Sequence, residues 1–149
     1  MEFTQHPAFP TFVFCAALLV LKMIAVGHYT GILRIRLGAI LNPEDVKAFG
    51  SDKPQAEIEH PDVARGLRAH RNDLESTLPF LAIGVPYLMI DPPAWLASTL
   101  FAAFTLLRIV FSVAYIKGLQ PWRSGSFMLG ELCVLIMVAQ MLSWGFANL

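Results

Sequence analysis

Four polar side chains that could together bind a charged ligand recur at helical spacing near the middle of the chain. They are Arg68, Arg71, Asn72 and Glu75. On an α-helix these positions fall within an arc of roughly 100°, and Asp73 points away from that arc. Guanidinium groups bind carboxylates and a carboxylate binds an ammonium group, so the stripe could hold a zwitterion. Alternatively, the charges only anchor a helix at a membrane surface, with Arg71 and Glu75 as an ordinary ion pair.

A second stripe lies inside a later apolar stretch. Its members, at positions i, i+3, i+4 and i+7 of a helix, are Arg108, Phe111, Ser112 and Tyr115. A charge within a membrane costs ~2.5–3.5 kcal/mol, so Arg108 should face a partner or a polar cavity. If its role is structural, we expect that partner to be Glu75 or Glu131. Lys22, the one charge of the first apolar stretch, should pair with an acid on another helix.

A third group, PWRSGS at 121–126, combines a cation and a hydroxyl with a helix start. Pro121 suits the beginning of a helix, and the free N–H groups that follow it attract anions. Arg123 and Ser124 would lie at this anion site, where a thiol would have a lowered pKa and become a thiolate. The alternative is a helix cap by Ser124 and an interfacial anchor formed by Trp122 and Arg123.

The elements that carry these groups follow from the apolar stretches. The chain has 149 residues, of which 56% are hydrophobic and only 15% are charged. The windows 11–33, 94–116 and 124–149 are long enough to cross a bilayer, and each contains one charge. The window 76–90 is too short unless its helix continues back through the charged stripe. We therefore expect one domain over 1–149, with transmembrane helices at approximately 9–36, 62–90, 93–117 and 122–147.

The basic residues predict the orientation of these helices. Seven of the 11 Lys and Arg residues lie between the first and second windows, and two flank the connection between the third and fourth. The positive-inside rule then places both termini outside or in a lumen, and the site on the cytoplasmic side. The membrane would be a bacterial cytoplasmic membrane or the endoplasmic reticulum. The Cys and His spacings predict neither a disulfide nor a metal site.

The cytoplasmic ends of these helices would supply cations for carboxylates, an acid for an ammonium group, and a cation with a hydroxyl for a thiolate. A small anionic thiol such as glutathione fits that set. A lipophilic co-substrate could reach the site laterally through the bilayer.

The stretch RAHRNDLESTLPF at 68–80 resembles the signature of the membrane-associated proteins in eicosanoid and glutathione metabolism, the MAPEG superfamily. The similarity extends through LVLKM, TGILRIRLGAILNPED, PDVARGLRAHRNDLE, RIVFSVAY and WRS, and so covers nearly the whole chain. Within the superfamily it is greatest to the microsomal prostaglandin E synthases and next to the microsomal glutathione transferases. The resemblance implies an all-α integral membrane protein, a bundle of four transmembrane helices that assembles as a homotrimer.

The resemblance also implies three glutathione sites, each between neighbouring subunits. Transferred by position, the contacts are Arg34, Arg71, Asn72, Asp73, Leu74, Glu75, Phe111, Tyr115, Arg123, Ser124 and Phe127, and the two stripes add Arg68 and Arg108. Glu75 would bind the amino group of glutathione and the arginines its carboxylates. Arg123 and Ser124 would hold the thiolate, and Asp45 would act with Arg123 in catalysis.

Three positions depart from the synthase pattern. Phe111 replaces a histidine, Phe127 a tyrosine and Glu131 a glutamine, and the turn before the last helix is one residue shorter. Two polar contacts to glutathione are thereby missing, and the edge of the site where the lipophilic substrate should lie is altered. These changes count against endoperoxide isomerisation more than against glutathione binding. We therefore expect a glutathione-dependent enzyme that conjugates lipophilic electrophiles or reduces lipid hydroperoxides, with endoperoxide isomerisation as a further activity. The alternative is a non-catalytic lipid-binding or scaffold protein of the same fold.

Overall fold

The structure is a computed structural model that describes residues 3–49 and 54–149. Its four long helices are α1 (Phe9–Leu37), α3 (Pro61–Met89), α4 (Ala94–Lys117) and α5 (Trp122–Ala147). A 3-10 turn (Phe3–Gln5) precedes α1, and a fifth, short α-helix, α2 (Pro43–Phe49), lies between α1 and α3. Each long helix begins and ends within one residue of the range expected from the sequence.

The four long helices differ in how apolar they are. Over their most apolar windows α1, α4 and α5 have mean hydropathies of 2.2, 1.9 and 1.8, and each is long enough to cross a membrane. Among the described residues, α3 is not apolar enough to count as a membrane-spanning helix, because its first half carries the charged stripe. It nevertheless runs unbroken through Pro79 and Pro86, so the charged stripe and the short apolar window form one helix. The described part of the chain thus contains three helices that are apolar enough to cross a membrane. That α3 also crosses the membrane stays a prediction.

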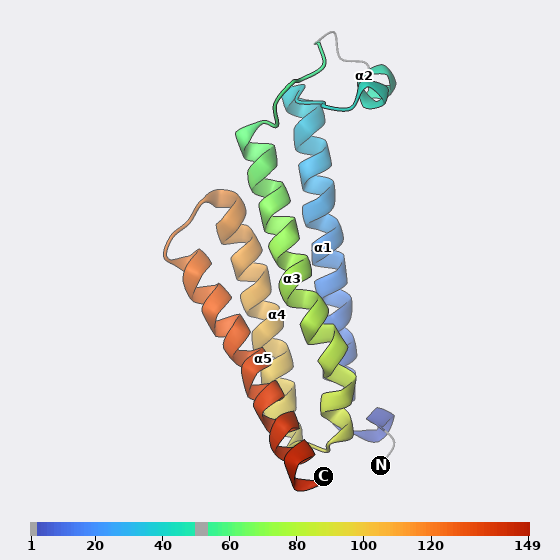
Figure 1. Cartoon of the computed structure of the whole chain (residues 1–149), viewed down its shortest axis with the longest axis vertical. Coiled ribbons are helices and arrows are strands. Elements are labelled where there is room, and N and C mark those ends of the chain that lie inside the picture. Colours follow the sequence, from blue (N-terminus) through green and yellow to red (C-terminus); the bar gives the residue numbers. More distant parts are fainter. Residues whose placement is uncertain (1–2, 50–53) are drawn as a thin grey trace.

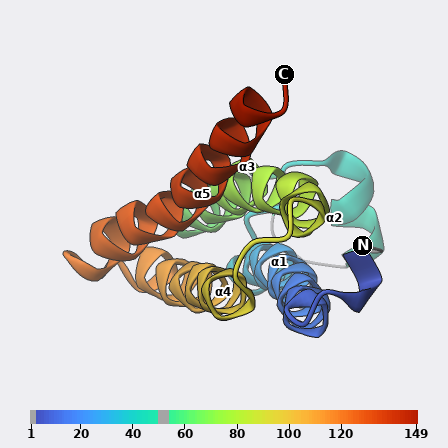
Figure 2. The same ribbon diagram turned by 90° about the horizontal axis from the view of Figure 1, so that it is seen from below.

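The long helices run side by side, with both chain ends at one end of the bundle and α2 at the other (Figure 1). At the α2 end, α1 and α3 extend beyond α4 and α5. Viewed along the bundle, α1, α3 and α4 cluster together while α5 crosses at an angle (Figure 2). The main neighbour of α5 is α4, with a smaller contact to α3.

An aromatic core holds the half of the bundle nearest the termini. Phe80 of α3 stacks on Phe104 of α4 with ring centroids 4.2 Å apart, and meets Phe101 edge-on at 5.8 Å. Phe12 of α1 lies 5.2 Å from the Phe101 ring. Such pairs each contribute about 0.5–1.5 kcal/mol beyond the burial of their area. Gly84 lets α1 approach α3 closely here, because a Cβ at this position would collide with the Phe12 ring.

The turn from α4 to α5 depends on a left-handed glycine. Gly118 has φ = 68°, a conformation that residues with a Cβ rarely adopt. Its N–H donates to Tyr115 O at 3.2 Å, and the N–H of Leu119 donates to Ala114 O at 2.8 Å. This C-terminal cap ends α4 and reverses the chain. The first turn of α5 thereby returns beside the end of α4, next to Tyr115.

Candidate functional site

A cavity of about 340 Å³ lies between α3, α4 and α5. It is lined by Asn72, Phe111, Tyr115, Arg123, Ser124, Phe127 and Met128. All of these except Met128 are sequence-predicted site residues. The volume lies near the lower end of the range for small-molecule sites, about 300–1,000 Å³. One chain therefore brings together the predicted thiolate-binding pair with contacts from two other helices.

The cationic side of this cavity is formed by Arg123. Its guanidinium carbon lies 5.0 Å from the centre of the Tyr115 ring, so an arginine of α5 rests on an aromatic face of α4. Gln120, in the turn before α5, also contacts this arginine. Ser124 Oγ is 3.1 Å from the Gln120 side chain. Arg123 thus contacts two neighbouring side chains, and Ser124 contacts one of them.

The start of α5 adds a further attraction for an anion. The N-cap residue, Pro121, makes no side-chain hydrogen bond to the helix. Ser124 therefore does not act as the N-cap, which argues against one alternative reading of this segment. The partial positive charge of a helix N-terminus adds to that of Arg123. An anion bound between Arg123 and Ser124 would meet a full charge, a helix dipole and a hydroxyl.

The floor of the cavity is aromatic. The Phe111 ring lies 5.4 Å from the Tyr115 ring and 5.9 Å from the Phe127 ring. Beneath it, the Arg108 guanidinium carbon lies 4.3 Å from the centre of the Phe111 ring. Phe111 thus separates the cavity from a second, fully buried arginine.

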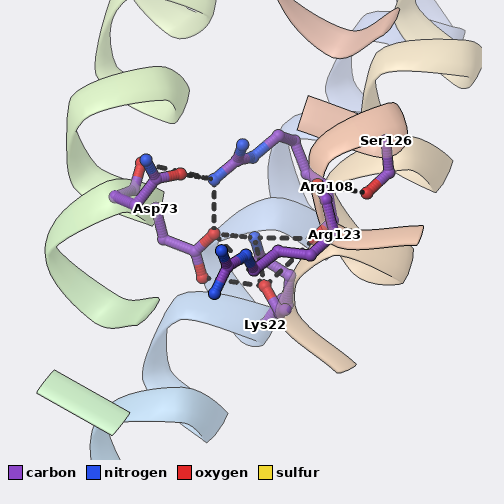
Figure 3. Close-up of polar contacts among 7 residues, drawn as sticks. Lys22, Asp73, Arg108, Arg123 and Ser126 are labelled. Carbon is purple, nitrogen blue, oxygen red and sulfur yellow. Dashed lines mark hydrogen bonds and ion pairs between the residues drawn. The ribbon is translucent and has the colours of Figure 1, made fainter. Parts of the chain in front are cut away.

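That arginine belongs to a buried charge cluster of Lys22, Asp73, Arg108 and Ser112. Lys22 Nζ donates to Asp73 Oδ1 at 2.6 Å, and Arg108 Nη2 donates to the same oxygen at 2.9 Å. Ser112 Oγ lies 3.1 Å from Asp73 Oδ2. Figure 3 shows Lys22 and Arg108 converging on Asp73 from two other helices. Asp73 and Arg108 are fully buried, so two cations share one anion away from water.

The cluster also orients one residue of the cavity wall. Arg108 Nη2 donates to Asn72 Oδ1 at 2.8 Å and to the Asn72 carbonyl at 3.2 Å. The Asn72 amide oxygen is therefore occupied, and its NH₂ group remains as the donor. Asp73 fixes Arg108, and Arg108 fixes Asn72.

These contacts test the expected ion pairs. The prediction that Lys22 pairs with an acid on another helix is confirmed, because Asp73 lies on α3. The prediction for Arg108 is corrected: its ion pair joins Asp73, Glu75 is exposed, and Glu131 interacts with Arg108 only through a weaker electrostatic attraction. Asp73, inferred from the resemblance to contact glutathione, is fully buried and hydrogen-bonded within the chain.

The remaining predicted residues lie outside the cavity of the same chain. Arg34 pairs with Glu59 at 2.6 Å and lines a hollow of about 160 Å³ together with Asp45. A separate surface hollow is lined by Ala64, Leu67, Arg68 and Arg71. Leu74 lies in an apolar groove between α1 and α3, and Glu75 is exposed. Within one chain, Asp45 and Arg123 thus line different hollows.

A family comparison shows what this chain is related to. Residues 12–143 match the MAPEG family model. The chain belongs to the MAPEG family. This MAPEG protein is 43% identical over 139 residues to prostaglandin E synthase of Macaca fascicularis and 42% identical to that of Homo sapiens, in each case covering 93% of this chain and 90% of the relative. It is 33% identical over 144 residues to microsomal glutathione S-transferase 1 of Sus scrofa, covering 95% and 93%. Together with the three apolar helices, the family makes it an integral membrane protein.

Sequence reasoning missed two residues at the site of this MAPEG protein. Met128 completes the cavity wall, but an apolar residue on an apolar helix carries no signal of a site. Gln120 contacts both Arg123 and Ser124. It lies in the turn before α5, where the spacing rules of a helix do not apply, so the sequence carried no clear signal of this contact.

Proposed function

We propose that this protein is a glutathione-dependent membrane enzyme that conjugates glutathione to lipophilic electrophiles or uses it to reduce lipid hydroperoxides. The observation that supports this most directly is the cavity at the start of α5, where Arg123 and Ser124 face Tyr115 and Asn72. The names of the relatives support the same class, since one group is named for prostaglandin E synthesis and another for glutathione transfer.

In this proposal the thiol of glutathione lies between Arg123 and Ser124. The positive charge and the helix N-terminus lower the pKa of that thiol, so it binds as a thiolate without needing a general base. The Asn72 NH₂ group, left free to donate by the contact of its oxygen with Arg108, serves the peptide part of the ligand. The Tyr115 ring packs against the Arg123 guanidinium and limits its movement.

Two reactions follow from a bound thiolate. In conjugation, the sulfur attacks an electrophilic carbon, a C–S bond forms, and the leaving group departs with its electron pair. In peroxide reduction, the sulfur attacks one peroxide oxygen, the O–O bond breaks, and the alkoxide takes a proton to become an alcohol. A second glutathione then converts the sulfenic acid to glutathione disulfide and water. Both reactions use the same electrostatically held sulfur.

The aromatic floor favours apolar electrophiles. Phe111 and Phe127 present rings to the cavity, with no polar group of their own. Isomerisation of a prostaglandin-like endoperoxide stays a further activity of this proposal, and the two phenylalanines make it the less favoured one.

The rest of the glutathione site would come from a neighbouring subunit of a homotrimer. Arg34, Arg68, Arg71 and Glu75 carry the charges that match the ends of glutathione, but they lie outside the cavity of their own chain. A second copy that places these residues at the cavity would complete the site, with Asp45 arriving beside Arg123. Each of three sites would then lie between two subunits, toward the cytoplasmic side.

The test is an activity assay of the detergent-purified protein with 1-chloro-2,4-dinitrobenzene and with a lipid hydroperoxide. Arg123→Ala should lower kcat/KM by about 10²-fold, as the loss of one preorganised charge-stabilising donor typically does. Arg36→Ala, an exposed arginine near the end of α1, is the matched control and should retain activity. If wild-type protein binds no glutathione by calorimetry, the non-catalytic lipid-binding or scaffold alternative is correct instead.

A further inference from the structure

Gln120 precedes α5 and has no role in the mechanism above, yet its side chain reaches both members of the thiolate-binding pair. The carboxamide atom nearest Arg123 lies 3.1 Å from Nε and 2.7 Å from Nη2. Guanidinium nitrogens carry only donors, so the atom that faces them must be the carboxamide oxygen. The carboxamide nitrogen then lies 3.1 Å from Ser124 Oγ and donates to it.

This arrangement leaves specific groups free for a ligand. The two hydrogen bonds to Gln120 occupy Nε and one N–H of Nη2, so three of the five guanidinium donors of Arg123 remain. Ser124 Oγ accepts from the Gln120 nitrogen at 3.1 Å, and its own proton can donate either to the Gln120 oxygen at 3.3 Å or to a ligand. Without Gln120, the Arg123 guanidinium would lose two hydrogen bonds and keep its contact with the Tyr115 ring. Gln120 thus limits the direction of the Arg123 guanidinium and holds the Ser124 hydroxyl beside it.

We propose that Gln120 is a positioning residue that aims Arg123 and Ser124 at the glutathione thiolate. The inference rests on the proposed function. It adds to the site a residue of the short turn between α4 and α5. Gln120 itself does not touch the sulfur. It acts on the pKa of the bound thiol, through the two groups that do.

The experiment compares wild type with Gln120→Met and Gln120→Glu. Methionine keeps the length of the side chain without its hydrogen bonds. Glutamate keeps an acceptor for Arg123, but it loses the donor to Ser124 and adds a negative charge beside the thiolate. The matched control is Gln140→Met, because Gln140 accepts from Tyr87 at 3.0 Å and lines none of the cavity. Gln120 is exposed, so its replacement removes no core contact.

The readouts are the pKa of the bound glutathione thiol, from its ultraviolet thiolate absorbance, and the affinities for glutathione and for S-methylglutathione. We expect the thiol pKa to rise in the order wild type, Gln120→Met, Gln120→Glu. For Gln120→Met we expect kcat at neutral pH to fall by about ten-fold, the usual effect of losing a hydrogen bond to a charged group. The affinity for S-methylglutathione, whose sulfur cannot ionise, should stay within about two-fold of wild type because Gln120 makes no contact with the ligand.

Other outcomes would overturn the inference while leaving the function in place. Unchanged thiol pKa values in both variants would show that Gln120 does not aim the pair. A lower pKa or tighter glutathione binding in Gln120→Met would show that Gln120 merely occupies Arg123 until the ligand displaces it. If wild-type protein binds no glutathione, the proposed function fails first, so the two failures are distinguishable. Size-exclusion chromatography of each variant confirms its folding, and Gln120→Glu decides the question if Gln120→Met does not fold.

Discussion

Asp73 accepts hydrogen bonds from Lys22 and Arg108, so two positive charges share one negative charge in a part of the bundle closed to water. Arg108 Nε and Nη1 find no hydrogen-bond partner among the described residues, although the guanidinium lies over the Phe111 ring. Lys22 and Arg108 therefore each depend on Asp73 for charge compensation, whereas Asp73 has two cationic partners. Asp73 is the member whose loss leaves the most charge uncompensated.

Asp73→Asn should accordingly destabilise the protein by about 3–5 kcal/mol, the cost of leaving buried charge without its partner. Lys22→Met should cost less, because it leaves a one-to-one pair between Asp73 and Arg108. The measurement is the thermal unfolding midpoint in detergent, with Glu57→Gln on the exposed loop as a control for the loss of a single acid. A midpoint lowered more by Lys22→Met than by Asp73→Asn would contradict this account of the cluster.

The sequence predicted the polar residues of the cavity better than it predicted their partners. Spacing placed Arg123 and Ser124 at a helix start and Tyr115 on the facing helix, because each of these inferences depends on local structure. The partner of Arg108 depends instead on how α3 is rotated about its axis. Asp73 faces away from the exposed stripe, and the inside of the bundle lies on that side. Lys22 and Arg108, each the one charge of an apolar window, were the sequence signal that an acid must lie on the inner side of α3.

At the scale of the elements, the contact between α1 and α3 is set by small residues. Gly84 receives the Phe12 ring, and Gly66 receives the side chain of Thr30. Helix bounds could be predicted because apolar length, prolines and glycines are local features. The crossing points could not, because a glycine within a helix gives no indication of which neighbour it will meet.

Gly84→Ala should destabilise the bundle by about 1–3 kcal/mol, because the added methyl group overpacks the contact with Phe12. Gly145→Ala is the control, since nothing lies within 4 Å of its Cβ position. In a helix that change should be neutral or stabilise by up to about 1 kcal/mol. The two variants are compared by thermal unfolding under the same conditions. Combining Gly84→Ala with Phe12→Leu should recover part of the loss, and strictly additive effects would show that the two side chains do not meet.

At the scale of the whole molecule, the proposed site is divided between the two ends of the sequence and between subunits. Arg34 and Asp45 line one hollow of the chain, while Arg123 lines another. In the proposed function, these two hollows of a single chain would be two halves of a glutathione site. A homotrimer would join one half from each of two neighbours around its axis.

This division predicts complementation between inactive subunits. Arg34→Ala and Arg123→Ala should each lower activity when expressed alone. When they are coexpressed in equal amounts, about a quarter of the subunit boundaries should unite an intact Arg34 with an intact Arg123, and activity should return in proportion. A coexpressed sample as inactive as its two parents would place both arginines in one chain's site. Native mass spectrometry of the same sample would report whether the particle contains three subunits.

The charge cluster also bears on how the chain is made. Lys22 enters the membrane with α1, but Asp73 follows it by 51 residues, and Arg108 comes 35 residues after Asp73. A nascent α1 therefore carries a lysine whose counter-ion has not yet been synthesised, at a cost of about 2.5–3.5 kcal/mol near the bilayer centre. When α3 is inserted, Asp73 compensates the charge of Lys22. When α4 follows, Arg108 gives the cluster a net positive charge again. The helices are thus coupled in time during biosynthesis, and α1 should reach its final depth only after α3 has left the ribosome.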